Sequence, residues 1–277
     1  MKRFTNLLSC LFAFGFAFTL ASCGSDDSKT ITIIASPTPH AEVLENAVAP
    51  LVKEAGYTLD LEVADDYVTP NKSVDDGSAF ANYFQHVPYL NEFNEENGTD
   101  VVPVFGVHYE PFDIYAGKTK SLDSIPDGAQ IGVPNDATNE ARALLLLQDN
   151  GVLTLKDGVG INATKADIES NPHNVQIEEL EAAAIADQLE SLDFGVINGN
   201  YDLENNLGDA LVYESTSSDA ATVYNNVVAI KSGNEDDPRV QVLEDAFQDD
   251  SVKQYFSDNY GNAVVYKYIP KDELYQG

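Results

Sequence analysis

The first 23 residues constrain this chain more than any other segment, because they decide the compartment in which it folds. Lys2 and Arg3 form a short basic start, and an apolar run follows from Leu7 to Leu20. Small residues then lead to Cys23. A basic start, an apolar stretch and a small-residue end in this order are typical of a secretory signal. The apolar run is shorter than the roughly 20 apolar residues that a membrane-spanning helix needs.

The last four residues of this segment, Leu20-Ala21-Ser22-Cys23, resemble the lipobox of bacterial lipoproteins. The resemblance implies that residues 1–22 are a signal peptide, that cleavage precedes Cys23, and that the Cys23 thiol carries lipid. Residues 23–30 would then tether the lipid to the folded chain, since they are short and polar. We therefore expect a lipid-anchored protein of the cell membrane that faces away from the cytoplasm. The alternative is a plain secretion signal in which the cysteine occurs by chance.

The cysteine count limits how the mature chain can be stabilised. The sequence has 2 cysteines, of which Cys10 lies in the segment that would be removed and Cys23 would carry lipid. No disulfide is then possible, although the compartment is oxidising. Stability must come from apolar burial, and a chain of 277 residues is long enough to divide a substantial core between two lobes.

The charge balance excludes some partners. Lys and Arg total 15 residues against 46 Asp and Glu, so the formal net charge is −31. A surface this acidic repels nucleic acid and anionic lipid headgroups. We therefore expect no nucleic-acid partner, and a membrane attachment made by lipid rather than by a basic patch. Calcium binding is the alternative use of so many carboxylates, but no segment follows the calcium-loop pattern of regularly spaced acidic residues around a Gly.

The apolar patterns predict alternating strands and helices. A strand, a helix and a strand in that order near the start favour an α/β fold with parallel pairing. No Gly/Pro/Ser-rich linker divides the chain after residue 30, so we expect two α/β lobes joined by extended crossovers of the chain. The predicted strands are 31–35, 59–63, 101–105, 131–133, 194–197 and 226–230, and the predicted helices are 40–55, 139–148, 177–192 and 238–247.

The common catalytic motifs are absent from the sequence. It contains no G-x-S-x-G, no H-E-x-x-H, no Walker loop and no G-x-G-x-x-G after a strand. His86 and His108 could converge with Glu110 on a metal, but the sequence does not show this, and the spacing of the histidines is not typical of a metal site. We expect no catalytic residue, metal or cofactor. An enzyme that uses His86 or His108 with a carboxylate as an acid/base pair is the alternative.

Several polar and aromatic residues fall at strand ends and helix starts, where open α/β sheets bind their ligands. Arg142 lies in a helix beside the run Ala143–Leu147. An arginine so close to apolar residues usually pairs with an acidic side chain of the protein, whereas the functional alternative is a bidentate clamp on a ligand carboxylate. The other candidates are Tyr67, Phe84, His86, Asn198 and Asn226, with Asn200 and Asn225 close by in sequence.

Five segments, taken together, resemble the methionine-binding lipoproteins of bacterial ABC importers, the NlpA-type family. They occur in order over nearly the whole mature chain. They are ANYFQHVPYL (81–90), VHYEPFDIYAG (107–117), VPNDATNEARALLLLQDNG (133–151), INGNY (197–201) and YNNVVAI (224–230).

The resemblance implies a two-lobed α/β fold of the periplasmic-binding-protein type, similar to type II, with the ligand in the cleft between the lobes. One lobe would comprise about residues 31–112 and 225–277, and the other about residues 113–224. It also implies a protein without a catalytic step, which closes on L-methionine, with D-methionine as the alternative ligand. The protein would deliver this ligand to a membrane permease driven by an ATPase.

The resemblance also assigns roles to the candidate residues. Tyr67 and Phe84 match the aromatic walls around the methionine thioether, a group that makes favourable contacts with aromatic rings. Arg142 matches the arginine that holds the α-carboxylate, as an arginine fork can. The remaining matches are the pocket histidine, His86, and the two asparagines, Asn198 and Asn226, which Asn200 or Asn225 could replace.

One residue departs from the family pattern. Asp113 follows Phe112, where a small residue is expected. Asp113 does not match a pocket position, so the departure bears on ligand range rather than on protein class. The alternatives that stay open are a binder of another amino acid, a binder of a methionine-containing dipeptide, and a surface interaction lipoprotein with a vestigial cleft.

Overall fold

The computed structural model describes residues 27–215 and 220–276. The predicted signal peptide, the predicted lipidation site Cys23 and the first part of the predicted tether at 23–30 lie outside these residues. Within them, no helix is both long and apolar enough to cross a membrane.

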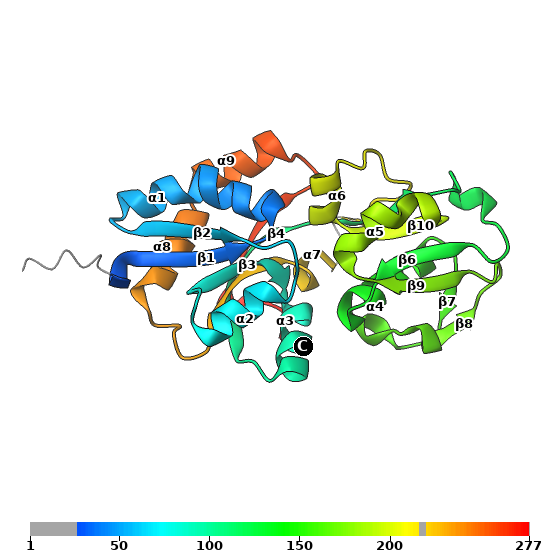
Figure 1. Cartoon of the computed structure of the whole chain (residues 1–277), viewed down its shortest axis with the longest axis horizontal. Helices are drawn as coiled ribbons and strands as arrows, with labels where there is room; N and C mark the ends of the chain where they lie inside the picture. Colours follow the sequence, from blue (N-terminus) through cyan, green and yellow to red (C-terminus); the bar gives the residue numbers. More distant parts are fainter. Residues whose placement is uncertain (1–26, 216–219, 277) are drawn as a thin grey trace, which may run out of the picture.

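Six strands form the larger of two main sheets, in the order β12-β4-β11-β3-β1-β2 (Figure 1). β1 pairs in parallel with β2 and β3, whereas β11 and β12 run antiparallel to their neighbours. The strands are β1 (Thr30–Ala35), β2 (Thr58–Val63), β3 (Ala81–His86), β4 (Val101–Tyr109), β11 (Asn226–Lys231) and β12 (Val265–Pro270).

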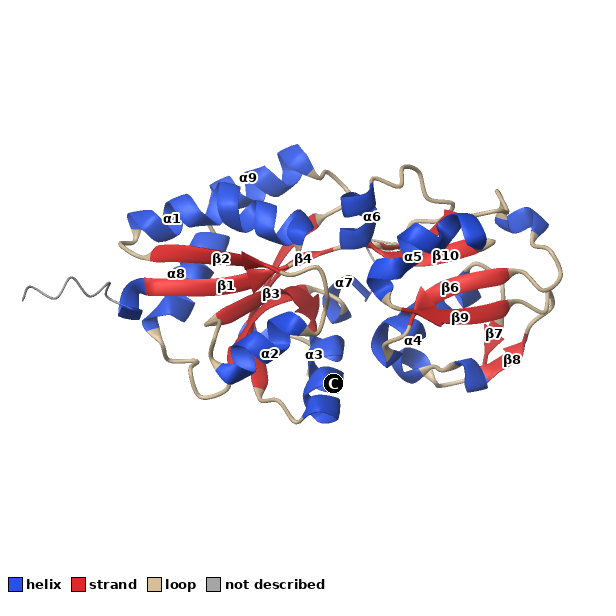
Figure 2. Ribbon diagram, viewed as in Figure 1, coloured by secondary structure: helices blue, strands red, loops and turns tan. Residues whose placement is uncertain are grey.

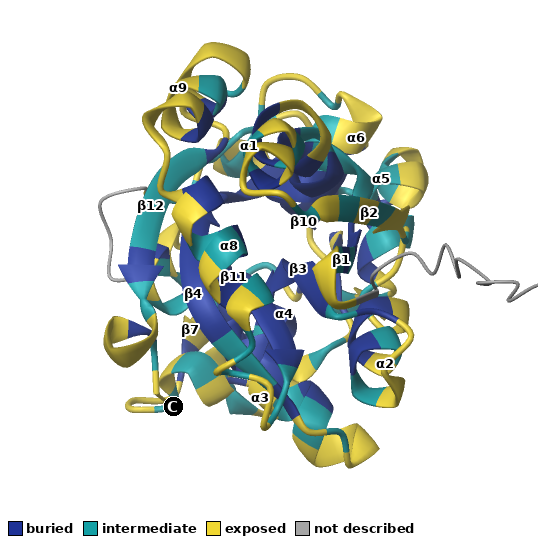
Figure 3. Cartoon of the chain, turned by 90° about the vertical axis from the view of Figure 1, so that its left-hand side faces the viewer, coloured by how far each residue is buried: buried dark blue, intermediate teal, exposed yellow. Residues whose placement is uncertain are grey.

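Helices cover both faces of this sheet, which explains the unbroken apolar run in β1. Ile31 and Ile33 point into a core under one set of helices, whereas Ile34 points to the opposite face. Figure 3 shows the buried strands β3 and β4 between helices whose outer faces are exposed. The first set is α1 (Ala49–Glu54), α8 (Pro238–Phe247) and α9 (Asp250–Asn259), and the second is α2 (Thr69–Asp76) and α3 (Val87–Asn97).

The smaller main sheet has the order β5-β10-β6-β9 and lies beside the larger one along the long axis of the molecule (Figure 2). Its strands are β5 (Phe112–Ala116), β6 (Gln130–Pro134), β9 (Gln176–Leu180) and β10 (Phe194–Asn198). Its helices are α4 (Ala137–Asp149), α5 (Ala182–Gln188) and α6 (Gly199–Asn205). A separate hairpin-like pair, β7 (Thr154–Leu155) and β8 (Ile168–Ser170), and the short α7 (Ala220–Val223) complete this part.

The chain crosses directly from one sheet to the other. β4 ends at Tyr109 in the larger sheet, and β5 begins at Phe112 in the smaller sheet, so only Glu110 and Pro111 connect them. The chain returns to the larger sheet at β11, which begins at Asn226. The predicted two-lobed α/β fold is therefore confirmed. The predicted lobe bounds stay a prediction.

The predicted helix at 177–192 is wrong in its first part. Residues 176–180 form β9, which pairs in parallel with β6, and α5 follows at 182–188. The open edge of β6 offers backbone groups that a strand can pair with, and this tertiary pairing overrides the local helical spacing of Ile177 and Leu180. The helix expected at 40–55 is wound partly as π-helical turns before α1.

Candidate ligand-binding site

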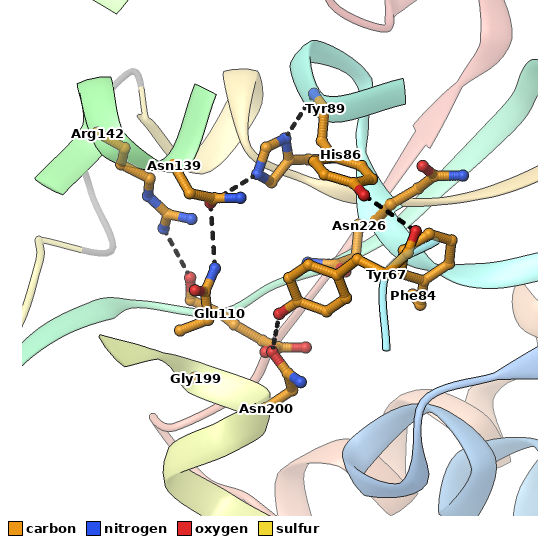
Figure 4. A pocket seen from close by; sticks show the side chains of 12 residues that line it. Tyr67, Phe84, His86, Tyr89, Glu110, Asn139, Arg142, Gly199, Asn200 and Asn226 are labelled. Atoms are coloured by element: carbon orange, nitrogen blue, oxygen red, sulfur yellow. Dashed lines mark hydrogen bonds between the residues drawn. The ribbon is translucent and has the colours of Figure 1, made fainter. Parts of the chain in front are cut away.

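A pocket lies between the two sheets, with a cavity volume of about 20 Å³, which is room for about one water molecule. The six residues predicted from the sequence, Tyr67, Phe84, His86, Arg142, Asn198 and Asn226, all line it. The other residues that line it are Gln85, Tyr89, Glu110, Asn139, Gly199 and Asn200 (Figure 4). The structure thus brings the predicted residues together, whereas their roles as ligand contacts stay predictions.

One end of the pocket is aromatic. Tyr67 packs against Phe84 and Tyr89, with ring centroids 5.6 Å apart in both cases. Phe84 comes from β3, the central strand that the periodicity analysis missed, because every residue of ANYFQH is buried and no alternation marks it. The Tyr89 hydroxyl donates to the Tyr67 carbonyl oxygen at 3.0 Å, which fixes the loop that carries Tyr67. This end offers ring faces and edges to an apolar ligand group.

A chain of amides spans the pocket from His86. Burial and the charge of Arg142 lower the pKa of His86 to about 3, so its ring is neutral. Its Nδ1 accepts from the Tyr89 backbone N–H at 3.2 Å, so Nε2 carries the proton and donates to Asn139 Oδ1 at 3.2 Å. The same oxygen accepts from Asn198 Nδ2 at 3.1 Å. These bonds orient the Asn198 amide.

Two side-chain atoms in the pocket have no hydrogen-bond partner among the described residues. They are Asn198 Oδ1, an acceptor, and Asn200 Nδ2, a donor, and both are buried. Buried polar atoms are nearly always paired in folded proteins, so each exception needs an explanation. A polar ligand that offers both a donor and an acceptor would supply it.

Arg142 is paired with an acidic side chain of the protein, as its apolar surroundings led us to expect. Its Nε donates to Glu214 Oε1 at 3.2 Å and its Nη2 to Glu214 Oε2, while Nη2 also donates to the Glu110 carbonyl oxygen at 2.9 Å. Burial alone would lower the pKa of Arg142, but Glu214 outweighs it and the pKa is raised. Arg142 lines the pocket as well, and its role as a clamp on a ligand carboxylate stays a prediction.

Asp113 supports the ion pair of Arg142 and Glu214 through a hydrogen bond to the Glu214 backbone. It does not line the pocket, and its Oδ1 accepts from the backbone N–H of Glu214 at 3.1 Å. The Glu214 carboxylate also accepts from the backbone N–H of Phe112 at 3.1 Å and from the Tyr109 hydroxyl. Asp113 therefore helps to hold the carboxylate that holds Arg142.

Glu110 supplies a carboxyl group in the same pocket, and the sequence analysis did not assign it to ligand binding. Its carboxylate accepts from His108 Nε2 at 2.7 Å and from the backbone N–H of Asn200. Burial raises its pKa, against the opposing charges of His40 and Arg142. A Cβ at Gly199 would lie 2.9 Å from the Glu110 Cβ, so only glycine fits beside this crossing segment.

Asn200 and Asn225, the two residues that could replace the predicted asparagines, lie in different surroundings. Asn200 lines the pocket, and its Oδ1 accepts from the Tyr67 hydroxyl at 2.6 Å. Asn225 does not line the pocket, because its side chain lies against Gly106 and donates to the Lys267 carbonyl oxygen at 3.0 Å. Neighbouring residues at the start of a strand point to opposite sides, so only one of Asn225 and Asn226 can reach the pocket.

Among the residues that the structure describes, one cluster of side chains has ligand atoms close enough together to hold a metal ion. The ligand atoms of His40, His108 and Glu110 lie within 4.8 Å of one another. The cluster thus contains His40 and not His86, which the sequence analysis had considered with His108 and Glu110. Both histidines, however, already face oxygen atoms with both ring nitrogens. We therefore assign the cluster to hydrogen bonding.

The comparisons with known proteins agree with this geometry. Residues 31–268 match the protein family described as NlpA lipoprotein. This chain belongs to the NlpA lipoprotein family. The methionine-binding lipoprotein MetQ of Bacillus subtilis is 38% identical to it over 263 residues, which cover 90% of this chain and 94% of the relative. The family resemblance read from the five segments is thus confirmed.

Solved structures of NlpA-type relatives share the fold. A lipoprotein from Ruminococcus gnavus is 53% identical, with a TM-score of 0.85 over 86% of this chain and 99% of the other. A nutrient-binding protein from Burkholderia cenocepacia, solved with methionine bound, is 38% identical, with a TM-score of 0.81 over 86% of this chain and 99% of the other. These likenesses confirm the predicted two-lobed binding-protein fold. Membership of a lipoprotein family also indicates a membrane-associated, extracytoplasmic protein.

The surroundings of Asp113 predict a pH dependence of stability in this family member. Burial, together with the charges of Asp202 and Glu214, raises the pKa of Asp113 to about 7. An unfolded Asp loses its proton near pH ~4. Between about pH 4 and 7 the folded state therefore holds a proton that the unfolded state has released, and this residue makes stability fall as the pH rises.

Asp113→Asn removes this titration and keeps an Oδ1 acceptor for the Glu214 N–H. We expect the variant to be more stable than the parent at pH ~8 by roughly 2 kcal/mol, with the difference vanishing near pH ~4. Urea unfolding across this pH range measures it, and Asp157→Asn, at an exposed position, is the control. A constant difference at all pH values would contradict the assignment.

Proposed function

We propose that this protein binds free L-methionine without a catalytic step and delivers it to the permease of an ABC importer, while lipid on Cys23 holds it at the membrane. One observation carries the proposal: the pocket sets an arginine, a glutamate and unpartnered amide atoms at one end against aromatic rings at the other. An α-amino acid with a soft apolar side chain matches this arrangement. The B. subtilis and B. cenocepacia relatives support it through the ligand in their descriptions.

The polar end suits the two charges of an amino-acid headgroup. Glu214 and the Glu110 carbonyl oxygen occupy Nε and Nη2 of Arg142, so Nη1 is left for a ligand carboxylate. The Asn200 Nδ2 donor can join it. The Glu110 carboxylate and Asn198 Oδ1 are acceptors, which an α-ammonium group needs. The pocket therefore presents donors and acceptors in a pattern that a zwitterion satisfies.

The aromatic end suits a thioether. Sulfur contacts with aromatic rings contribute ~0.3–1.5 kcal/mol each, and three rings surround this end. Other apolar side chains also fit against rings, so binders of another amino acid or of a methionine-containing dipeptide remain the alternatives. A vestigial cleft is the alternative from another class, and it predicts that no small molecule stabilises the protein.

Contacts across the pocket support a closing motion as part of the function. Tyr67, from the larger-sheet side, donates to Asn200 on α6 at 2.6 Å. His86, at the end of β3, contacts Asn139 on α4. The Glu92 carboxylate on α3 accepts from the backbone N–H groups at the start of α4. Hinge closure of two lobes around a ligand would assemble these contacts.

A panel of ligands tests the proposed substrate. Ligand-stripped protein lacking residues before Gly24 is heated with each L-amino acid, D-methionine and glycyl-methionine in turn. A ligand at 100 times its dissociation constant should add about 2.7 kcal/mol of stability. We expect the largest shift with L-methionine. A shift with another ligand alone would overturn the substrate, and no shift with any of them would favour the vestigial cleft.

Arg142 variants test how the carboxylate is held. Arg142→Lys keeps the charge opposite Glu214 but loses the planar fork, so we expect methionine binding at least about 30-fold weaker by calorimetry. Arg142→Ala should abolish detectable binding. Arg239→Lys, which alters an arginine paired with Asp237 away from the pocket, is the matched control. Affinity near that of the parent in Arg142→Ala would refute this role.

A pair of tyrosine variants tests the contacts that span the pocket. Tyr67→Phe keeps the ring but removes the donor to Asn200, so the two sides lose a hydrogen bond and the Asn200 amide loses its orientation. We expect roughly 10-fold weaker methionine binding. Tyr89→Phe removes a hydroxyl whose partner, the Tyr67 backbone, lies on the same side, and should weaken binding by less than about 3-fold. Equal losses in calorimetry would argue against a role of the Tyr67 hydroxyl in closure.

A further inference from the structure

Two fully buried histidines behind the pocket are unused by the proposed function. His40 is 1% exposed and His108 is 0% exposed, and neither lines the pocket. Their rings lie beside each other, with centroids 5.0 Å apart. Each contacts a residue that does line the pocket: His40 contacts Asn226, and His108 contacts Glu110.

The hydrogen bonds of His108 determine which of its nitrogens carries the proton. Nε2 lies 2.7 Å from Glu110 Oε1, and Nδ1 faces the Tyr83 hydroxyl. Burial raises the pKa of Glu110, but the Asn200 backbone N–H that points at its carboxylate and the nearby charge of Arg142 favour the ionised, acceptor-only form. His108 must then donate from Nε2, while Tyr83 donates to Nδ1. Burial lowers the pKa of His108 to about 3, in agreement with a neutral ring that has one N–H.

The same reasoning orients Asn226 through His40. Nε2 of His40 lies 3.0 Å from Asn226 Oδ1 and 3.4 Å from Glu110 Oε1, and Nδ1 lies 2.7 Å from the Ser36 hydroxyl. A nitrogen that faces a carboxylate oxygen carries the proton, so Asn226 must turn its oxygen toward it. The Asn226 amide could otherwise flip, because its two ends have nearly the same shape. With the oxygen held, Nδ2 is left as a donor for the ligand.

We propose that His40 and His108 are positioning residues that give the pocket its selectivity for a free α-amino acid. His108 holds Glu110 as the acceptor for the ligand ammonium, and His40 holds Asn226 as a donor to the ligand carboxylate. The ligand class is an α-amino acid with both charges unmodified, which disfavours N-acylated amino acids and dipeptides. The inference rests on the proposed function and specifies its substrate class.

Ligands that lack one charge separate the two roles. 4-(Methylthio)butanoate has the carboxylate and thioether of methionine without the ammonium, and L-methioninol has the ammonium without the carboxylate. Competition calorimetry gives the affinity of each for the parent protein and for the variants. For each variant, the change in affinity for L-methionine is compared with the change in affinity for each of the two analogues.

The His108 variants test the ammonium arm. We expect His108→Leu to bind L-methionine and L-methioninol roughly 10- to 100-fold more weakly, because Glu110 loses a donor that stabilises its ionised form. Its affinity for 4-(methylthio)butanoate should change by less than about 3-fold. His108→Gln, which restores an N–H donor, should recover most of the loss. Glu110→Gln should show the same ligand pattern and serves where His108→Leu does not fold.

The His40 variants test the carboxylate arm and should show the opposite pattern. His40→Leu should weaken L-methionine and 4-(methylthio)butanoate roughly 10-fold, and change L-methioninol by less than about 3-fold. His40→Gln should rescue binding, and Asn226→Leu reads the same arm if His40→Leu does not fold.

Three outcomes would overturn the inference. Equal losses for all three ligands would mean that the histidines only stabilise the fold. Stoichiometric metal in the purified parent, lost in His108→Leu, would replace the hydrogen-bond network by a metal site. A parent protein that binds no amino acid would remove the proposed function and this inference together, whereas the first two outcomes leave methionine binding intact.

Discussion

Arg142 and Glu110 are buried ionisable side chains between the two sheets, and their need for polar partners determines which residues surround the pocket. Neither charge can leave water without partners, because the cost of desolvation is several kcal/mol per ion. Arg142 is therefore surrounded by Glu214, the Glu110 carbonyl oxygen and the rings of Phe112 and Tyr224. Polar side chains are therefore needed behind the pocket as partners of Arg142 and Glu110.

The position of Glu110 links the fold to the site. It follows the last residue of β4 and, with Pro111, forms the short crossing to β5. Its carbonyl oxygen holds Arg142 from α4, and its carboxylate holds the start of α6. Gly199 leaves room for this approach. One residue thus contacts both sides of the pocket through its backbone and its side chain.

The sequence predicted much of this arrangement, and the failures have physical causes. The apolar run at 31–35 predicted a buried strand, because a strand that is covered on both faces has an unbroken run of apolar residues. Arg142 and Asn198 could be assigned because they occur in segments that resemble the family. His40 and Glu214 could not, because their partners lie 186 and 72 residues away in the chain. The first part of the helix predicted at 177–192 was wrong for the same reason, since β9 forms against a strand that is distant in sequence.

The crossing at Glu110 also has a mechanical consequence. In the proposed function Glu110 belongs both to the connection between the lobes and to the contacts with the ligand, so the angle between the lobes and the strength of ligand binding change together. A partner that pulls the lobes apart would strain the Glu110 backbone and the bonds of Arg142 at once. Such a partner would release the ligand by acting on the outer surface of the two lobes, without a group that competes with the ligand for its contacts in the pocket.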